Sequence, residues 1–124
     1  VRGGRDLILD GEELQLISIL LNGSPFTNYK IDDGKLVIAE AELAHLANFT
    51  LVVKNSVNPS NNATLEGLYL SNAAYCTQCE AEGFRKITYF LDRPDILSVY
   101  TVTIIADKTA FPHVLSNGNL VEAY

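Results

Sequence analysis

The chain has 124 residues, of which 48% are hydrophobic and 19% are charged, and its formal net charge is −6 at pH 7. This length and composition are typical of a globular protein, so we expect one domain over residues 1–124 and exclude a disordered chain. An acidic chain without a basic stripe excludes nucleic acid as a partner, and no apolar run approaches the ~20 residues of a membrane span.

The first half of the sequence alternates apolar and polar residues with a period of two, which is typical of β-strands. Turn-forming residues separate the strands at 22–25, and Asp32-Asp33-Gly34 predicts a tight hairpin. Residues 40–47 have helical propensity but are too few for more than about two turns. The strands predicted in this half are 14–21, 26–31, 35–39 and 49–54.

The second half begins with a loop over 55–64, which is rich in Asn, Ser and Pro. A short helical turn is expected within 84–90, and Pro94 ends any helix that precedes it. Strands are predicted at 65–70, from Tyr75 into a polar stretch, at 98–106, and in an Asn-Gly hairpin over 114–121. Roughly seven to nine short strands with turns about every 8–12 residues predict an all-β fold, either a sandwich or a curved sheet.

The polar stretch at 77–85 is the most informative part of the chain, because apolar strand-like sequence flanks it on both sides. Alternate residues of an extended backbone share a face, so Gln78, Glu80 and Glu82 are predicted to project to one side. An amide oxygen and carboxylates on one face recognise a cation such as a protonated α-amino group, whose pKa is roughly 7.7–8.0.

A second interpretation of the same residues stays open, in which Glu80 and Glu82 form ordinary ion pairs with nearby basic residues. The candidate partners are Arg85, Lys86 and Arg93. A pair between Asp92 and Arg85 is expected to fix the segment internally.

Cys76 and Cys79 form a C-x-x-C motif, which occurs in redox dithiols and in half-sites for zinc. A structural zinc site needs four ligands, and the other good candidates, His45 and His113, are single and distant in the sequence. We therefore favour two small side chains on opposite faces of a strand, and we expect no metal ligand in this chain.

Motifs of a complete enzyme are missing from the sequence, which has no H-E-x-x-H, no G-x-S-x-G and no phosphate-binding glycine loop. Ser, His and Asp residues are present, but no spacing marks a triad. We expect no catalytic residue among the 124 and an isolated chain that is inactive.

Four stretches of the second half are specific enough to compare with a known family. They are Leu65-Glu66-Gly67-Leu68-Tyr69, the run CTQCEAEGFRKITYFLDRPD from Cys76 to Asp95, Ile105-Ala106-Asp107-Lys108 and Leu115-Ser116-Asn117-Gly118-Asn119. Through these stretches the sequence from about residue 65 to residue 120 closely resembles the aminopeptidase N family of bacterial gluzincin zinc aminopeptidases. Tyr89-Phe90-Leu91 stands where the animal relatives have Phe-Pro-Cys, which supports a bacterial-type protein.

The resemblance implies part of an N-terminal all-β domain, a curved and saddle-like sheet assembly that covers a thermolysin-like catalytic domain and forms one wall of the active-site cleft. By position, Gln78 and Glu80 match the family's substrate-binding glutamine and glutamate, and the glutamate holds the free amino terminus of the peptide. The parent would be a hydrolase, a zinc-dependent metalloprotease of the membrane-alanyl aminopeptidase type that releases N-terminal amino acids. Its zinc ligands, general base and transition-state tyrosine would lie beyond Tyr124, so this chain alone would bind no zinc.

Two further classes of function stay open beside this one. The chain is either a stand-alone β-sandwich module that binds amines or peptide termini, or a structural domain whose polar strand pairs with its own basic residues. The resemblance also implies a cytoplasmic bacterial protein. Strand edges without neighbours lead us to expect self-association of the isolated chain.

Overall fold

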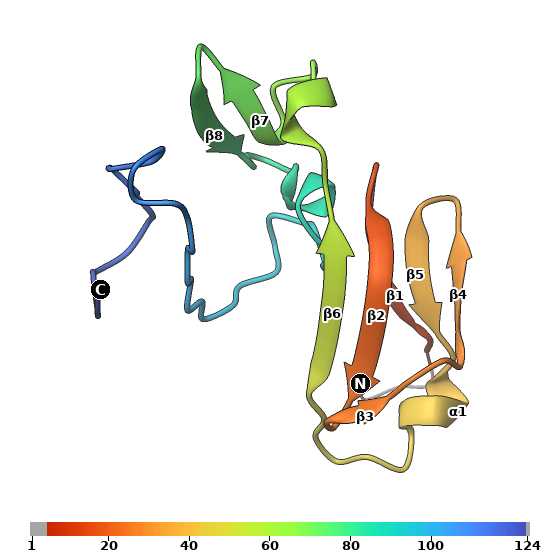
Figure 1. The fold of residues 1–124 in the computed structure, drawn as a ribbon. Helices are drawn as coiled ribbons and strands as arrows, with labels where there is room; N and C mark the ends of the chain where they lie inside the picture. Colours follow the sequence, from red (N-terminus) through yellow and green to blue (C-terminus); the bar gives the residue numbers. More distant parts are fainter. Residues whose placement is uncertain (1–4, 124) are drawn as a thin grey trace.

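The computed structural model describes residues 5–123, in which nearly all regular structure is β-strand (Figure 1). Eight strands form three antiparallel sheets, and the only helical elements described are one short α-helix and two 3₁₀ turns. The prediction of an all-β fold is confirmed. None of the helices within residues 5–123 is long and apolar enough to span a membrane.

The first sheet has the strand order β1-β5-β4. In the β4–β5 hairpin Asp32 faces Lys35, and the two residues between them, Asp33 and Gly34, both have positive φ angles, 48° and 76°. This geometry twists in the same sense as the strands, which is why Asp-Gly favours hairpins. The turn is as predicted. The strands are β1 (Leu7–Leu9), β4 (Tyr29–Asp32) and β5 (Lys35–Ile38).

The second sheet has the strand order β3-β2-β6. A two-residue turn at Asn22 and Gly23 joins β2 to β3, and Asn22 Oδ1 accepts a hydrogen bond of 2.8 Å from the Thr50 backbone N–H at the start of β6. One side chain therefore ties the turn to the neighbouring strand. The strands are β2 (Gln15–Leu21), β3 (Ser24–Pro25) and β6 (Leu51–Ser56).

The hydrophobic core lies between these two sheets. Leu9 and Leu36 come from the first sheet, Ile19 comes from the second, and Tyr89 joins them from a segment outside the strands. All four are buried. The backbones of Asp10 and Phe90 exchange hydrogen bonds of 2.8 and 3.0 Å, so the segment around Tyr89 is fixed beside the end of β1.

The third sheet is a separate hairpin that follows β6 and extends beyond the other two sheets (Figure 1). It consists of β7 (Gly67–Ser71) and β8 (Ala74–Gln78), joined by a turn at Asn72 and Ala73. The helical elements are α1 (Glu40–Leu43), which lies within the predicted helical stretch, η1 (Pro59–Asn61) and η2 (Phe84–Lys86).

Two predicted elements near the C-terminus are wrong. Residues 98–106 and 114–121 form neither a strand nor a hairpin, and the segment follows an irregular path to one side of the sheets (Figure 1). A strand needs a neighbour for its backbone hydrogen bonds, and within residues 5–123 no strand pairs with this segment. Its apolar side chains face solvent, among them Val99 and Ile105, which are 102% and 93% exposed.

Candidate substrate-binding site

The β7–β8 hairpin brings Gln78 to the base of the third sheet. Gln78 is the last residue of β8 and pairs across the sheet with Gly67, the first residue of β7. The tip of the hairpin, Asn72 and Ala73, lies at its opposite end. Gln78 is therefore placed where the hairpin meets η2, because Gly67 packs directly against Lys86 of η2.

The polar stretch does not continue as a strand beyond Gln78, and this part of the prediction is wrong. The chain bends after Gln78 and returns to it, so that a methyl group on Gly83 would lie 2.8 Å from the Gln78 carbonyl oxygen. Gly83 has a φ of 144°, which side chains rarely allow. Glu80 and Glu82 therefore lie in a closed turn over residues 78–83, and they do not share the face of an extended strand with Gln78.

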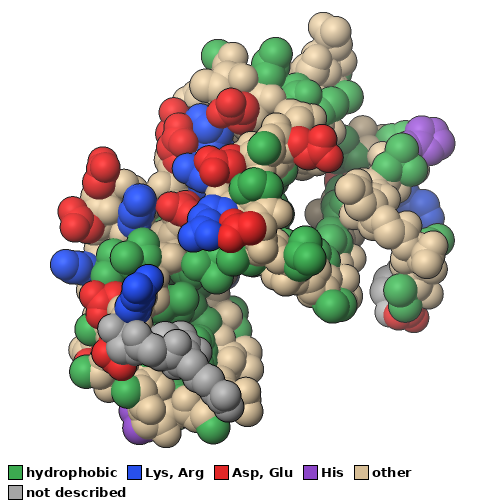
Figure 2. Space-filling model, turned by 180° about the vertical axis from the view of Figure 1, so that it is seen from behind, with side chains coloured by type: hydrophobic (Ala, Val, Ile, Leu, Met, Phe, Trp, Pro, Cys, Tyr) green, Lys and Arg blue, Asp and Glu red, His purple; other side chains and the backbone are tan. Residues whose placement is uncertain are grey.

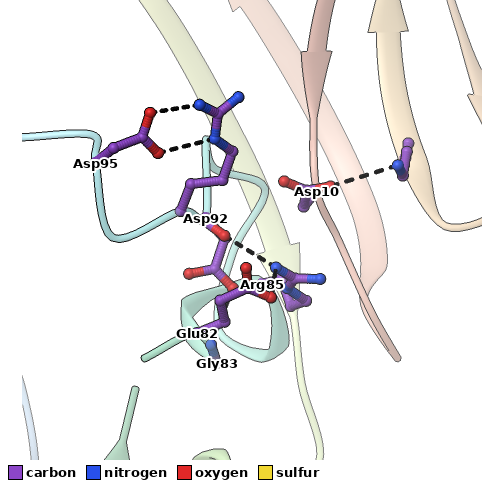
Figure 3. A network of polar contacts seen from close by, with 8 residues as sticks. Asp10, Glu82, Gly83, Arg85, Asp92 and Asp95 are labelled. Atoms are coloured by element: carbon purple, nitrogen blue, oxygen red, sulfur yellow. Dashed lines mark hydrogen bonds and ion pairs between the residues drawn. The ribbon is translucent and has the colours of Figure 1, made fainter. Parts of the chain in front are cut away.

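The buried carboxylate of Asp92 anchors the far end of this closed turn (Figure 3). Its Oδ2 accepts hydrogen bonds from the backbone N–H of Gly83 at 2.9 Å, the backbone N–H of Arg85 at 3.2 Å and Arg85 Nε at 2.7 Å. Arg85 also donates to the Asp92 carbonyl oxygen at 2.9 Å. The predicted Arg85–Asp92 pair is confirmed.

The pKa of the Asp92 carboxyl lies below its ordinary value despite burial. Burial by itself raises that pKa, but the hydrogen bonds from the Arg85 side chain and from the backbone of Gly83 and Arg85 lower it by more. The hydrogen bond to Asp92 in turn raises the pKa of Arg85. Asp92 therefore stays a charged acceptor inside the protein, as a carboxylate with this many donors does.

The basic side chains around the turn are all paired, but not with Glu80. Arg85 Nη2 contacts Glu82 at 2.6 Å, Lys86 Nζ contacts Glu12 at 2.8 Å, and Arg93 pairs with Asp95. Figure 2 shows acidic and basic side chains intermixed on one face of the molecule, in agreement with this pairing.

This pairing leaves the Glu80 carboxylate, among others of residues 5–123, without an ion pair. Within residues 5–123 it takes part in no ion pair, and the Gln78 side chain donates to its backbone oxygen at 3.3 Å. The interpretation in which neighbouring basic residues neutralise both acidic residues therefore holds for Glu82 and not for Glu80. The structure brings Gln78 and Glu80 together and leaves the Glu80 carboxylate exposed.

The two cysteines lie on either side of the end of β8, and both are free thiols. Burial and the nearby Asp92 charge raise the pKa of the Cys79 thiol, which disfavours the reactive thiolate. In the part of the chain that the structure describes, no three His, Cys, Asp or Glu side chains come together as metal ligands. His45 and His113 are both exposed and join no such group.

Two surface hollows lie away from Gln78 and Glu80. An apolar one of about 350 Å³ lies between β1 and β6, and residues of the segment 88–91 line it as well. A polar one of about 260 Å³ is lined by Asp10, Gly11, Glu12, Asp33, Lys35 and Arg85. Neither hollow includes Gln78 or Glu80, and both of these residues are exposed.

The sequence interpretation missed two residues that hold η2 in place. Asn55 of β6 donates from its side chain to the Ile87 carbonyl oxygen at 2.9 Å and accepts from the Thr88 hydroxyl at 2.8 Å. Lys86 is buried, with a side chain only 4% exposed. The sequence carries no signal for Asn55, because it falls at the start of the predicted loop over 55–64, where an amide side chain is common.

Comparison with known proteins gives one family and several relatives. The family described as the Peptidase M1 N-terminal domain matches residues 3–124. Aminopeptidase N of Escherichia coli (strain K12) is 52% identical over 115 residues, which are 93% of this chain. Aminopeptidase N of Caulobacter vibrioides is also 52% identical, over 123 residues or 96% of this chain.

A solved structure is similar over nearly the whole chain. The crystal structure of Legionella pneumophila aminopeptidase A in complex with aspartic acid superposes with a TM-score of 0.86 and 34% sequence identity, covering 95% of this chain. This chain spans only 13% and 14% of the lengths of the two aminopeptidase N relatives and 14% of the solved chain.

Proposed function

This chain belongs to the Peptidase M1 N-terminal domain family, and we propose that it forms the amine-recognising wall of the substrate cleft in a zinc aminopeptidase. In this proposal Glu80 binds the protonated amino terminus of the peptide and Gln78 contributes its amide oxygen. The catalytic apparatus belongs to the rest of the full-length protein, and the isolated chain is inactive.

The observation that carries the proposal is that Glu80 forms no ion pair within residues 5–123, while Arg85, Lys86 and Arg93, the basic residues nearest to it in the sequence, are each paired with another carboxylate. An exposed carboxylate next to free basic residues would be neutralised by them, and its attraction for a substrate amine would be weakened. Because Arg85, Lys86 and Arg93 are paired with other carboxylates, none of these pairs competes with a ligand amine for Glu80. A carboxylate–ammonium contact is a charge-assisted hydrogen bond, about twice as strong as a neutral one.

Zinc has no ligand set among the residues that the structure describes. The cysteines and histidines do not fit the metal, because a zinc site needs three or four converging N, S or O ligands. The contribution of this chain is therefore to bind and orient the substrate, and the open position of Gln78 and Glu80 suits a wall that another domain completes.

The test is the variant Glu80→Gln in the full-length protein. Removing a charge-assisted contact of about 1.5–3 kcal/mol is expected to raise KM and lower kcat/KM for free-amine peptides roughly tenfold or more. A sharper readout compares competitive inhibition by a dipeptide with that by its des-amino analogue. The wild type is expected to prefer the amine, and Glu80→Gln is expected to lose this preference.

The matched control is Glu66→Gln, which removes the same charge from an exposed position before β7. It should leave the amine preference intact. Wild-type kinetics and wild-type amine preference in a correctly folded Glu80→Gln protein would overturn the proposed function.

A further inference from the structure

Asp92 is linked to Glu80 through a short chain of contacts, although the two residues are 12 positions apart in the sequence. The first link is the hydrogen bond of 2.9 Å from the Gly83 backbone N–H to Asp92 Oδ2. The second is the close packing of Gly83 on the strand end, since a methyl group there would lie 2.8 Å from the Gln78 oxygen and 3.1 Å from Cys79 Cα. The two ends of the closed turn, Gln78 and Gly83, are therefore in close contact, and Asp92 holds the Gly83 end.

Two further contacts hold the inside of the turn. Arg85, which is bound to Asp92, holds the Glu82 carboxylate at 2.6 Å. The Gln78 side chain holds the Glu80 backbone oxygen at 3.3 Å. Glu80 thus lies between two fixed points, Gln78 and Gly83, and Gly83 is held by Asp92.

The burial and hydrogen bonds of Asp92 suit it to hold the closed turn and not to contact a ligand. The residue is 5% exposed and already accepts three hydrogen bonds at one carboxylate oxygen. A surface ion pair would be worth little, but a buried carboxylate of this kind fixes its donors because losing it leaves them unsatisfied.

From these contacts we infer that Asp92 is a positioning residue that sets the placement of Glu80, and through it the affinity for the amino terminus of the substrate. The inference rests on the proposed function of Glu80. Substrate-positioning contacts are sensitive to displacement, and a shift of about 1 Å can reduce activity by up to about 100-fold. The loss is expected in KM, because the ammonium contact holds bound substrate as well as the transition state.

The experiment uses Asp92→Asn in the full-length protein, which keeps the shape of the side chain but removes its charge and turns one oxygen into a donor. KM for a free-amine peptide is expected to rise about tenfold, while kcat per folded molecule stays within about threefold of the wild type. A purely structural role would lower the amount of active protein, and KM does not depend on that amount. The matched control is Asp95→Asn, because Asp95 is an exposed carboxylate on the same loop and, within residues 5–123, its ion pair is with Arg93 alone. It should keep the wild-type KM.

The double variant Glu80→Gln/Asp92→Asn tests the role of Asp92 separately from the proposed function of Glu80. Once the Glu80 charge is gone, adding Asp92→Asn should raise KM by less than about twofold, because coupled residues are not additive. If Glu80→Gln raises KM and Asp92→Asn does not, or if the two effects on KM multiply fully, the role of Asp92 is overturned and that of Glu80 stands. If Glu80→Gln leaves KM unchanged, the proposed function itself is overturned.

A second variant covers the case in which Asp92→Asn does not fold. Arg85→Lys keeps a positive charge but loses the planar guanidinium that binds Asp92 Oδ2, the Asp92 carbonyl oxygen and Glu82 together. It should raise KM severalfold with kcat retained. A folded Arg85→Lys protein with the wild-type KM overturns the inference.

Discussion

Gly67 and Lys86 are in such close contact that a methyl group on Gly67 would lie 2.5 Å from Lys86 Cβ. Gly67 also has a φ of 68°, in the left-handed region. We expect Gly67→Ala to lower the free energy of unfolding by about 2–4 kcal/mol, from the left-handed backbone and from overpacking together. Urea denaturation of the chain at low concentration measures this value.

The control for Gly67→Ala is Gly23→Ala, since Gly23 has a φ of 83° and no atom within 4 Å of the added methyl group. Gly23→Ala should lower the free energy of unfolding only by the cost of a left-handed backbone for alanine, about 1–2 kcal/mol. Equal losses in the two variants would mean that the contact between the hairpin and η2 is looser than the structure indicates.

The ion pair between Lys86 and Glu12 gives a second prediction. The Lys86 side chain is 4% exposed, so Glu12→Gln leaves a buried ammonium group without its carboxylate. Glu12 itself is 49% exposed, and solvent reduces the loss to about 1–3 kcal/mol. Thermal unfolding of the double variant Glu12→Gln/Lys86→Met should recover most of this loss, because it removes the unpaired charge. No recovery would contradict the assignment of the loss to the buried charge.

The lowered pKa of Asp92 predicts how the free energy of unfolding depends on pH. Its folded pKa lies below the unfolded value of about 3.9, so its contribution is complete above that value and is lost as the pH falls through the folded pKa. The difference in unfolding free energy between the wild type and Asp92→Asn should therefore be constant near neutral pH and shrink below about pH 4. Urea titrations at several pH values measure it, and a difference that does not begin to shrink below about pH 4 would contradict the assignment.

The hairpins could be predicted because their turns are encoded locally. Asp33-Gly34 and Asn22-Gly23 adopt positive φ angles at both positions, as expected for two-residue turns between alternating strands. The core residues of the first two sheets follow the same alternation. The fold of residues 14–56 therefore follows its sequence pattern, apart from shifts of the strand ends and the short strand β3 in the predicted turn, whereas β1 (Leu7–Leu9) was not predicted.

The closed turn at the candidate site could not be predicted in the same way. Alternation in 77–85 indicates an extended strand, but the chain bends because Gly83 can adopt a φ of 144° and because Asp92, nine residues further on, binds its N–H. That hydrogen bond is not visible in local propensity. The turn, and not a shared strand face, brings Gln78 to the Glu80 backbone, and the binding role of both residues stays a prediction.

The segment from residue 97 onward shows a second reason why local propensity fails to predict structure, since strand propensity without a partner strand produces no sheet. It exposes several large apolar side chains, with Leu97, Val99 and Leu115 each more than nine-tenths exposed. Burial of such surface is favourable at roughly 25 cal/mol per Å². We therefore expect the isolated 124-residue chain to associate with itself, with this segment at the contact.

Sedimentation velocity over a hundredfold range of protein concentration tests this expectation. A weight-average sedimentation coefficient that rises with concentration is expected for the wild type. The variant Leu97→Ser/Val99→Ser/Leu115→Ser should shift association to higher concentration, because it removes exposed apolar side chains that take part in no core contact. The matched control Ile17→Ser changes an equally apolar but isolated side chain at the bulge in β2, 54% exposed, and should leave association unchanged. A monomer at every concentration would show that this surface alone does not drive association.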